Sequence, residues 1–515
     1  MLKYINPPAI KMQACGYRAT SLSFGRVYCM DPIPIATQVL IIGGGPAGSY
    51  AACCLAREGI EVVLLESEKF PRYHIGESML PSMRQFLHFI DCEEEFLSHG
   101  FYTKVGAAFK LGQNRKEGYT DFIAADTNNF AWNVVRSEAD DILFRHAARS
   151  GAKVFEETKV IAIDFSEDLT PTMASWERHD SKGTISFDYV VDASGRRGLI
   201  SNRYLKNRRF NQSLKNIATW AYWCGTGSYM PDTSRAGAPF FEALLDGSGW
   251  VWFIPLHNKT TSIGIVMNQN EYSRKKKLQE KVGDKAFYLQ ELGRAPTVMS
   301  LIGQGELVTN GPTPTIMSAS DYSYSADSYA GNQYRIIGDA GAFIDPFFSN
   351  GIHLAVSGGL SAAVTICASL RGHCSEREAC QWHSARIGTS YTRFLIVVLS
   401  AYKQMQAQQE PVLADINEDH FDRAFGHFRG IIQGTADITT QSSKLLTEEE
   451  LARTLDFCTQ AYMPPDLSDA EGRAKIELVR DIGSSETIDA VAANCLHGRS
   501  ICLQRGKLGL VKVAE

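Results

Sequence analysis

Three glycines near the start of the chain have the spacing of a turn that binds a dinucleotide. Gly43, Gly45 and Gly48 follow an apolar run and precede a stretch of small residues. In such a turn the first glycine permits a tight bend, the second lets the backbone approach a pyrophosphate, and the third lets helix and strand pack closely. The helix that follows offers free N–H groups to the anion. The pattern predicts a dinucleotide site that includes Gly44 and Ala47, with a purely structural turn as the alternative.

A carboxylate stands where such a cofactor needs one. Glu66 follows Gly48 by 18 residues, at the end of a second apolar run. An acid at this distance accepts hydrogen bonds from the adenosine ribose. The sequence contains one glycine fingerprint of this kind. It therefore predicts one dinucleotide and no second site for a nicotinamide cofactor.

Two tryptophans form a second pattern. Trp250 and Trp252 are two residues apart within an apolar run. Successive side chains of a strand point to opposite faces, so these two indoles share one face. Such a pair can wall off a cofactor pocket, although two core tryptophans in a sheet would have the same spacing.

Hydrophobic periodicity predicts the elements that carry these residues. The runs 37–42 and 60–65 suit buried parallel strands, and 49–58 between them suits a helix. Together they form a β-turn-α-β unit of about 30 residues. Further elements are expected as strands at 187–195 and 334–339, helices at 134–148 and 351–368, and antiparallel strands between about 210 and 320, including 250–255 and 261–267.

The predicted fold class is α/β, with a Rossmann-like dinucleotide-binding domain interleaved with an antiparallel substrate sheet. We expect this domain at residues 37–375, the inserted sheet at about 210–320, and a helix-rich C-terminal region at 376–515. Residues 1–36 contain four basic residues before the first acid, Asp31. We interpret them as a disordered extension, with an organelle transit segment as the alternative.

Composition excludes several classes of protein. The chain has 515 residues, of which 44% are hydrophobic and 21% charged, so a disordered or fibrous protein is not expected. A net charge of −5 gives no basic surplus for binding nucleic acid. The longest apolar run, 394–399, is far shorter than the roughly 20 residues of a spanning helix. An integral membrane protein is therefore excluded, whereas a peripheral contact stays open.

The twelve cysteines form no C-x-x-C motif and no zinc-ligand spacing with the twelve histidines. The sequence therefore predicts no metal. Scattered free thiols are typical of a reducing compartment. We expect a cytoplasmic protein, with organelle or peripheral membrane association left open.

Several segments resemble the flavoprotein monooxygenase superfamily. The late Gly-Asp element at 338–341 is similar to one that holds the ribityl and phosphate region of FAD, which implies this role for Asp339. Arg136 matches a flavin-contacting position of that superfamily. The resemblance implies that the dinucleotide is FAD.

Other segments resemble the flavin-dependent halogenases within that superfamily. The W-x-W-x-I-P motif at 250–255 separates halogenases from hydroxylating relatives, and the Gly-Glu-Ser element at 76–78 resembles the branch that halogenates phenols and pyrroles. The resemblance extends over about 39–437. The segments that look like the fungal members chlorinating polyketide phenols lie at 70–81, 109–110, 117–122, 345–354, 422–425 and 433–437.

This resemblance implies roles for further residues. The family has an essential lysine 27 residues after the glutamate of its Gly-Glu-Ser element, and Lys104 follows Glu77 by this distance. A lysine shielded from water has a lowered pKa and donates hydrogen bonds, which suits holding hypohalous acid or forming a chloramine. Lys110 is the competing candidate, and a solvated surface charge is the alternative for either lysine. Glu77 itself is expected to contact the cofactor.

The segment 347–352 resembles the halide loop of the family. Backbone N–H groups of Asn350 and Gly351 are expected to bind chloride at the start of a helix. The family places the residue at Ile352 against the flavin ring. Tryptophan-specific relatives have a glutamate where this chain has Phe348, which implies an electron-rich phenolic substrate rather than an indole.

The sequence thus predicts an FAD-dependent halogenase. A separate flavin reductase would supply reduced FAD, and hypochlorous acid would be relayed to Lys104, which presents it to a phenolic polyketide-type ring. The first alternative is an FAD-dependent aromatic hydroxylase of the same fold. The second is a flavoprotein without enzymatic activity.

Overall fold

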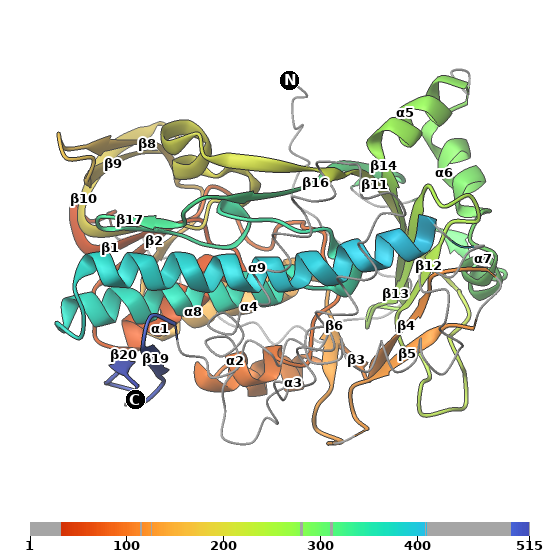
Figure 1. The fold of residues 1–515 in the computed structure, drawn as a ribbon, viewed down its shortest axis with the longest axis horizontal. Helices are drawn as coiled ribbons and strands as arrows, with labels where there is room; N and C mark the ends of the chain where they lie inside the picture. Colours follow the sequence, from red (N-terminus) through yellow and green to blue (C-terminus); the bar gives the residue numbers. More distant parts are fainter. Residues whose placement is uncertain are drawn as a thin grey trace, which may run out of the picture.

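The computed structural model describes residues 32–113, 116–124, 126–278, 282–309, 313–406, 408 and 496–513. It has two large sheets side by side, with helices packed along the first sheet and at the outer end of the second (Figure 1). The segments 422–425 and 433–437, which carry part of the family resemblance, lie outside the described residues, as do residues 1–31.

The first sheet has a parallel core with the order β7-β2-β1-β10-β18. Its side chains in β1 and β2 are almost completely buried, because helices or further strands cover both faces. The core strands are β1 (Ala36–Ile42), β2 (Val62–Leu65), β7 (Lys153–Phe155), β10 (Ser181–Asp192) and β18 (Tyr334–Ile336). Antiparallel additions are β8 (Lys159–Phe165), β9 (Pro171–Arg178) and β17 (Ala330–Gly331).

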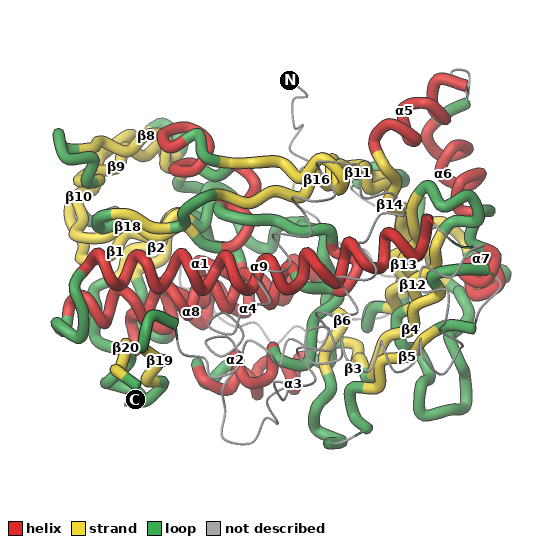
Figure 2. The backbone as a smooth tube through the Cα atoms, viewed as in Figure 1, coloured by secondary structure: helices red, strands yellow, loops and turns green. Residues whose placement is uncertain are grey.

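A layer of helices packs on this sheet. Helix α1 (Pro46–Arg57) contacts α4 (Arg136–Arg149) and α8 (Gly351–Leu370), and α8 contacts α9 (Glu376–Gln406). Helix α8 is long and apolar enough to cross a membrane, but 89% of its most apolar window is buried inside the molecule. Figure 2 shows α9 as one long helix that runs from the first sheet towards the second.

The second sheet has the order β15-β11-β14-β13-β12-β4-β5, and β16 pairs with β11. All its pairs are antiparallel except β12 with β4. The strands are β4 (Gly106–Lys110), β5 (Gly118–Asp121), β11 (Arg208–Cys224), β12 (Phe240–Ala243), β13 (Gly249–Pro255), β14 (Thr260–Asn268), β15 (Glu306–Leu307) and β16 (Met317–Ala326). Helices α5 (Gln269–Leu278), α6 (Asp284–Leu292) and α7 (Pro296–Ile302) lie at its outer end (Figure 1).

Smaller elements complete the described chain. Helices α2 (Met83–Phe89) and α3 (Glu93–His99) precede a two-stranded sheet of β3 (Tyr102–Lys104) and β6 (Ala131–Asn133). Strands β19 (Arg499–Cys502) and β20 (Gly509–Lys512) form a hairpin that packs against α8. The short helical turns are η1 (Gly195–Arg197), η2 (Leu199–Leu205), η3 (Gly338–Ala340) and η4 (Pro346–Phe348).

The strands and helices expected from periodicity are confirmed. The first β-turn-α-β unit is β1, α1 and β2, and the helices expected at 134–148 and 351–368 are α4 and α8. The second sheet differs from the expected insertion in one respect. It also includes β4 and β5, which precede residue 210 in the chain, because Phe240, Phe241 and Glu242 of β12 pair with β4. The domain boundaries themselves stay predictions.

Candidate active site

The glycine turn between β1 and α1 has the geometry that its spacing predicts. Gly43 has a φ of +106°, and a Cβ there would lie 2.3 Å from the carbonyl oxygen of Ala193. A Cβ on Gly48 would lie 1.9 Å from the carbonyl oxygen of Gly43. Both positions therefore require glycine for local packing.

Gly45 differs because the space beside it is open. Its φ of −69° suits any residue, and the nearest atom to a Cβ there is the Arg72 guanidinium at 3.4 Å. Gly45 is the N-cap of α1 and provides no side-chain cap, so the first N–H groups of the helix face this space. An open cradle beside helix N–H groups and a guanidinium fits the pyrophosphate of FAD. The signal for Arg72, a basic residue in the segment 70–81, was present in the sequence but was not used.

Glu66 closes the same turn. Its Oε2 accepts a hydrogen bond from the backbone N–H of Gly44 at 2.6 Å, and its Oε1 accepts one from the N–H of Glu68 at 2.8 Å. The carboxylate is held at the carboxyl end of β2, next to β1 in the sheet. It therefore stands at the crevice where an adenosine ribose would lie in this type of fold.

The late Gly-Asp element lies beside this turn. A Cβ on Gly338 would be 3.0 Å from Cβ of Ala47 in α1. Burial raises the pKa of Asp339, and the nearby positive charges of Arg196, Arg136 and Arg208 oppose that rise. An acid close to the turn is placed to bind a polyol or phosphate region of a dinucleotide that extends from Gly45.

Arg136 begins α4 and is held rigidly. It donates from Nε and Nη2 to the two carboxylate oxygens of Asp140 at 2.8 and 3.0 Å, and from Nη1 to the carbonyl oxygen of Ile75 at 2.9 Å. Burial disfavours ionised Asp140, but the charges of Arg136 and Arg72 outweigh it and lower its pKa. Arg136 also lies within electrostatic reach of Asp339 and Glu77. The structure therefore groups these predicted cofactor residues around one guanidinium.

Lys104, at the end of β3, is 1% exposed. Its Nζ donates to Ser78 Oγ and to the carbonyl oxygen of Met79, both at 2.9 Å. Burial lowers its pKa to about 7. Lys104 is therefore a buried amine whose ammonium form is disfavoured, and its catalytic role stays a prediction.

Lys110 has a different environment. Its Nζ donates to Thr297 Oγ1 at 2.8 Å and lies 3.4 Å from Oε1 of the buried Glu242. The ion pair joins β4 to β12, and the hydrogen bond joins β4 to α7. Lys110 therefore has a structural role that needs no catalytic function.

Ser78 links Lys104 to the tryptophan strand. Its hydroxyl donates to Asn133 Oδ1 at 3.1 Å, and Asn133 Nδ2 donates to the carbonyl oxygen of Pro255 at 3.1 Å. Pro255 ends β13, which carries Trp250 and Trp252. Sequence reasoning did not identify Asn133, which has no motif of its own.

Glu77 is 3% exposed and receives hydrogen bonds at the junction of the two sheets. Tyr222 donates to its Oε1 at 2.6 Å, and the Tyr222 and Tyr73 hydroxyls are 3.1 Å apart. Burial raises the pKa of Glu77 to about 7, although hydrogen bonds from Ser262 and Tyr222 oppose this rise. Its Oε2 has no hydrogen-bond partner within the described part of the chain.

The predicted halide loop is a short helical turn followed by α8. The Asp345 carboxylate accepts from the N–H of Phe347 at 3.1 Å, and Ser349 has a φ of +59° that redirects the chain. Asn350 is the N-cap of α8 and Gly351 its first residue, so their N–H groups lie where a helix supplies no acceptor. A Cβ on Gly351 would meet nothing within 4 Å among the described atoms. The loop has space and donors for a monovalent anion.

The tryptophan pair packs between the second sheet and the halide loop. Both indoles are buried, with ring centroids 5.9 Å apart, and Trp250 makes an edge contact with Phe347 at 5.0 Å. Phe348 is also buried, and its ring lies 5.2 Å from that of Phe109. Ile352, in the first turn of α8, is 4% exposed. The halide loop and β13 thus meet in an aromatic environment that excludes water.

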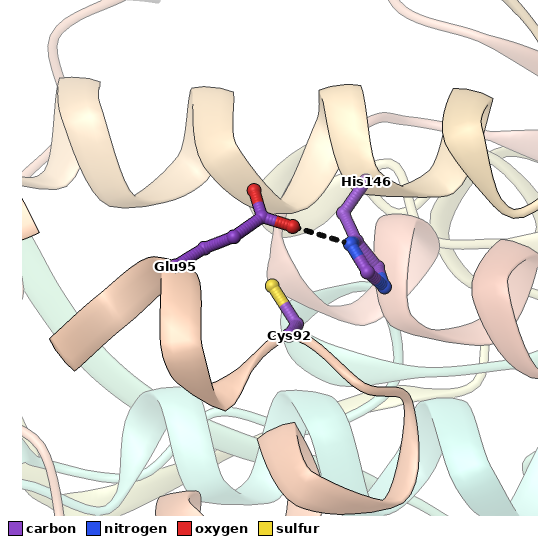
Figure 3. A group of neighbouring side chains, drawn as sticks. All are labelled: Cys92, Glu95 and His146. Atoms are coloured by element: carbon purple, nitrogen blue, oxygen red, sulfur yellow. Dashed lines mark hydrogen bonds and ion pairs between the residues drawn. The ribbon is translucent and has the colours of Figure 1, made fainter. Parts of the chain in front are cut away.

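Two side-chain groups in the described chain have metal-ligand composition. Figure 3 shows the first, in which Cys92 and Glu95 approach His146. His146 Nδ1 lies 2.8 Å from Glu95 Oε1 and its Nε2 lies 2.7 Å from the Ile90 carbonyl oxygen, so both nitrogens face acceptors. Burial raises the pKa of Cys92, which keeps its thiol protonated. Hydrogen bonding accounts for this cluster without a metal.

The second group joins α3, α4 and the turn between β13 and β14. The Nε2 atoms of His99 and His257 lie 2.7 and 3.1 Å from the same Oε2 of Glu138. These distances are those of hydrogen bonds to one carboxylate. We assign no metal to this group either.

Comparison with known proteins identifies the family of the chain. The family model for tryptophan halogenases matches residues 38–128 and 116–468. The chain belongs to this family. Flavin-dependent halogenase armH1 of Armillaria mellea is 54% identical over 445 residues, which cover 84% of each chain. Sulochrin halogenase gedL of Aspergillus terreus is 50% identical over 424 residues, covering 79% of this chain and 76% of that protein.

Solved structures of halogenases share the fold. The crystal structure of CmlS, a flavin-dependent halogenase, has a TM-score of 0.69 at 25% identity, and the match covers 92% of this chain and 84% of that one. The predicted family, the α/β fold class, the enzyme class of flavin-dependent halogenase, and FAD with chloride are thereby confirmed.

Proposed function

We propose that this halogenase chlorinates an electron-rich phenolic ring of polyketide type, and that Lys104 delivers the chlorinating agent. The observation that carries this proposal is the buried amine of Lys104, held by Ser78 and Met79 with its pKa lowered to about 7. When bound, reduced FAD would supply, with oxygen, the oxidising power that converts chloride to hypochlorous acid.

The hydrogen bonds of Lys104 leave one direction of its nitrogen for the reaction. A neutral amine has two N–H bonds and a lone pair. Because Ser78 Oγ and the Met79 carbonyl oxygen accept from Nζ, the lone pair points away from both. It can attack the chlorine of hypochlorous acid, forming an N–Cl bond and releasing hydroxide. In the ammonium form the third N–H points the same way and can hydrogen-bond to hypochlorous acid.

Chloride would be held by the Asn350 and Gly351 N–H groups at the positive end of α8. The buried rings of Trp250, Phe347 and Phe348 would keep hypochlorous acid away from bulk water.

The substrate assignment rests on Phe348 and on a relative. An indole ring needs help to stabilise the cation formed on chlorination, whereas a phenol delocalises that charge onto its own oxygen. Phe348 offers no charge for this purpose and is buried among aromatic rings. Sulochrin halogenase, named for its substrate, is 50% identical to this chain. These observations support a phenol.

A separate flavin reductase completes the proposal. The single glycine turn is assigned to FAD, and the Trp250–Trp252 face would hinder a nicotinamide from stacking on the flavin. Reduced FAD can diffuse, so the reductase need not bind this chain. The eight described cysteines are all free, which supports our proposal of a reducing, cytoplasmic location.

The test uses the purified enzyme, FAD, oxygen, NADPH and an unrelated flavin reductase, with resorcylic and orsellinate-type phenols. Mass spectrometry should find products heavier by one chlorine in place of hydrogen, and only when chloride is present. Products that gain one oxygen irrespective of chloride would identify a hydroxylase and refute the proposal. Lys110→Ala serves as the matched lysine control and should still chlorinate.

A further inference from the structure

The indole N–H of Trp250 is bonded to a residue of α9 that lies far away in the sequence. Trp250 Nε1 donates to the hydroxyl of Tyr402 at 2.8 Å. Trp250 is 1% exposed, so this bond is shielded from water. Its ring alone would suffice to fill space beside Phe347. Space filling alone therefore does not explain why this position has an indole N–H group.

Tyr402 passes this contact on to the halide loop. Its hydroxyl donates to Asp345 Oδ2 at 2.7 Å. Asn216 Nδ2 donates to the same Oδ2 and to the Tyr402 hydroxyl, both at 2.9 Å. A tyrosine hydroxyl has one proton to donate and two lone pairs. Here all three are used, so the orientation of every bond in the group is determined.

Asp345 in turn holds the loop in shape. Its Oδ1 accepts from the N–H of Phe347 at 3.1 Å, and its carbonyl oxygen accepts from Asn350 Nδ2 at 3.3 Å. Its own N–H donates to Ser323 Oγ at 2.9 Å. Asp345 and Asn350 are both completely buried. A displacement of the Asp345 carboxylate therefore moves Phe347, and a displacement of the Asp345 backbone that follows from it moves Asn350.

We propose that Trp250 and Tyr402 are positioning residues for chloride, acting through Asp345. This rests on the proposed function, which places chloride at the Asn350 and Gly351 N–H groups. The first tryptophan of the W-x-W motif sets the direction of these donors through two hydrogen bonds and one carboxylate. Helix α9 thereby joins the second sheet to the loop that begins α8 (Figure 1).

Conservative variants test this chain of bonds. Tyr402→Phe removes the hydroxyl and Trp250→Phe removes the indole N–H, and each keeps a ring. We measure the rate of chlorination against chloride concentration at saturating phenol and reduced FAD. Because Tyr402→Phe loses a hydrogen bond to a carboxylate, its KM for chloride should rise about tenfold. Trp250→Phe loses a bond to a neutral hydroxyl and should raise this KM less. For both variants, kcat at saturating chloride and KM for the phenol should change far less.

The double variant separates a relay from two independent effects. If Trp250 acts through Tyr402, Trp250→Phe/Tyr402→Phe should raise KM for chloride no further than Tyr402→Phe alone. If instead the double variant raised KM for chloride by the product of the two single-variant factors, the proposal would be overturned. An unchanged KM for chloride in a folded Tyr402→Phe protein would also overturn it.

The same sheet provides a matched control. Trp223 Nε1 donates to the Tyr288 hydroxyl at 3.1 Å, and both residues are buried in a separate core cluster. Tyr288→Phe removes an equivalent bond and should leave KM for chloride unchanged. An equal rise in this control would show that loss of any buried indole–phenol bond has the effect, and would overturn the assignment.

Failure of the proposed function can be distinguished from failure of the positioning role by the products of the wild-type enzyme. If the proposed function fails, the wild-type enzyme forms no chloride-dependent product, whereas failure of the positioning role leaves wild-type chlorination intact with equal KM values. Should Tyr402→Phe not fold, as circular dichroism and FAD content would show, Trp250→Phe and Tyr288→Phe together decide the test.

Discussion

Replacing Lys104 with methionine removes a buried amine and keeps an apolar chain of similar length. The pKa of Lys104 falls from 10.5 to about 7 because burial disfavours its ammonium form. In the unfolded chain the ordinary pKa returns. Between pH 7 and 10.5 the unfolded state therefore binds more protons than the folded state, and the wild-type protein gains stability as the pH rises. Below pH 7 both states are protonated, and this contribution is constant.

The magnitude follows from the size of the shift. One pH unit of difference in pKa corresponds to about 1.4 kcal/mol. The free energy of unfolding of the wild type should thus rise by about 4–5 kcal/mol between pH 7 and 10.5, relative to Lys104→Met. Lys104 is 1% exposed, so solvent screening does not reduce this figure much.

The assay is urea denaturation of both proteins at pH 7, 8 and 9, where the difference should grow by about 2–3 kcal/mol. Lys104→Met should also keep FAD and lose chlorination, because no nitrogen remains to carry the chlorine. If the free energies of unfolding of the wild type and Lys104→Met changed equally with pH, Lys104 would titrate normally. That result would refute the reasoning from burial. Wild-type chlorination by Lys104→Met would separately refute its catalytic role.

Three further outcomes are expected. Gly45→Val should fold but lose FAD, because the side chain enters the open space beside the turn; the flavin absorbance of the purified variant measures this, and a full complement of FAD would contradict it. Asp140→Asn should lower the free energy of unfolding by about 3–5 kcal/mol, since it leaves the buried guanidinium of Arg136 without its charged partner; denaturation at pH 7 gives the value, and a loss below about 1 kcal/mol would contradict it. NADPH alone should not bleach the flavin absorbance in stopped-flow experiments, and an added reductase should restore chlorination; rapid bleaching stimulated by substrate would instead favour a hydroxylase.

Local patterns determined the cofactor turn. Gly43, Gly45, Gly48 and Glu66 lie within one strand-turn-helix-strand unit, whose parts are close in the chain and must fold together. The bond from the Gly44 N–H to Glu66 follows because β1 and β2 are neighbours. The shared face of Trp250 and Trp252 likewise follows from the two-residue period of a strand. The family motifs added Lys104 and the halide loop, for which spacing alone gave no chemistry.

Only the tertiary structure decided which groups surround these residues. Lys104 meets Ser78 and the Met79 carbonyl oxygen across a separation of about 25 residues, and Trp250 meets Tyr402 across 152. Ser78 belongs to the Gly-Glu-Ser element, but neither that motif nor any periodicity indicates the contact with Lys104 or the one between Trp250 and Tyr402. Such contacts depend on how whole elements pack rather than on local spacing. The lowered pKa of Lys104 has the same origin, since burial is a property of the assembled core and not of any one segment.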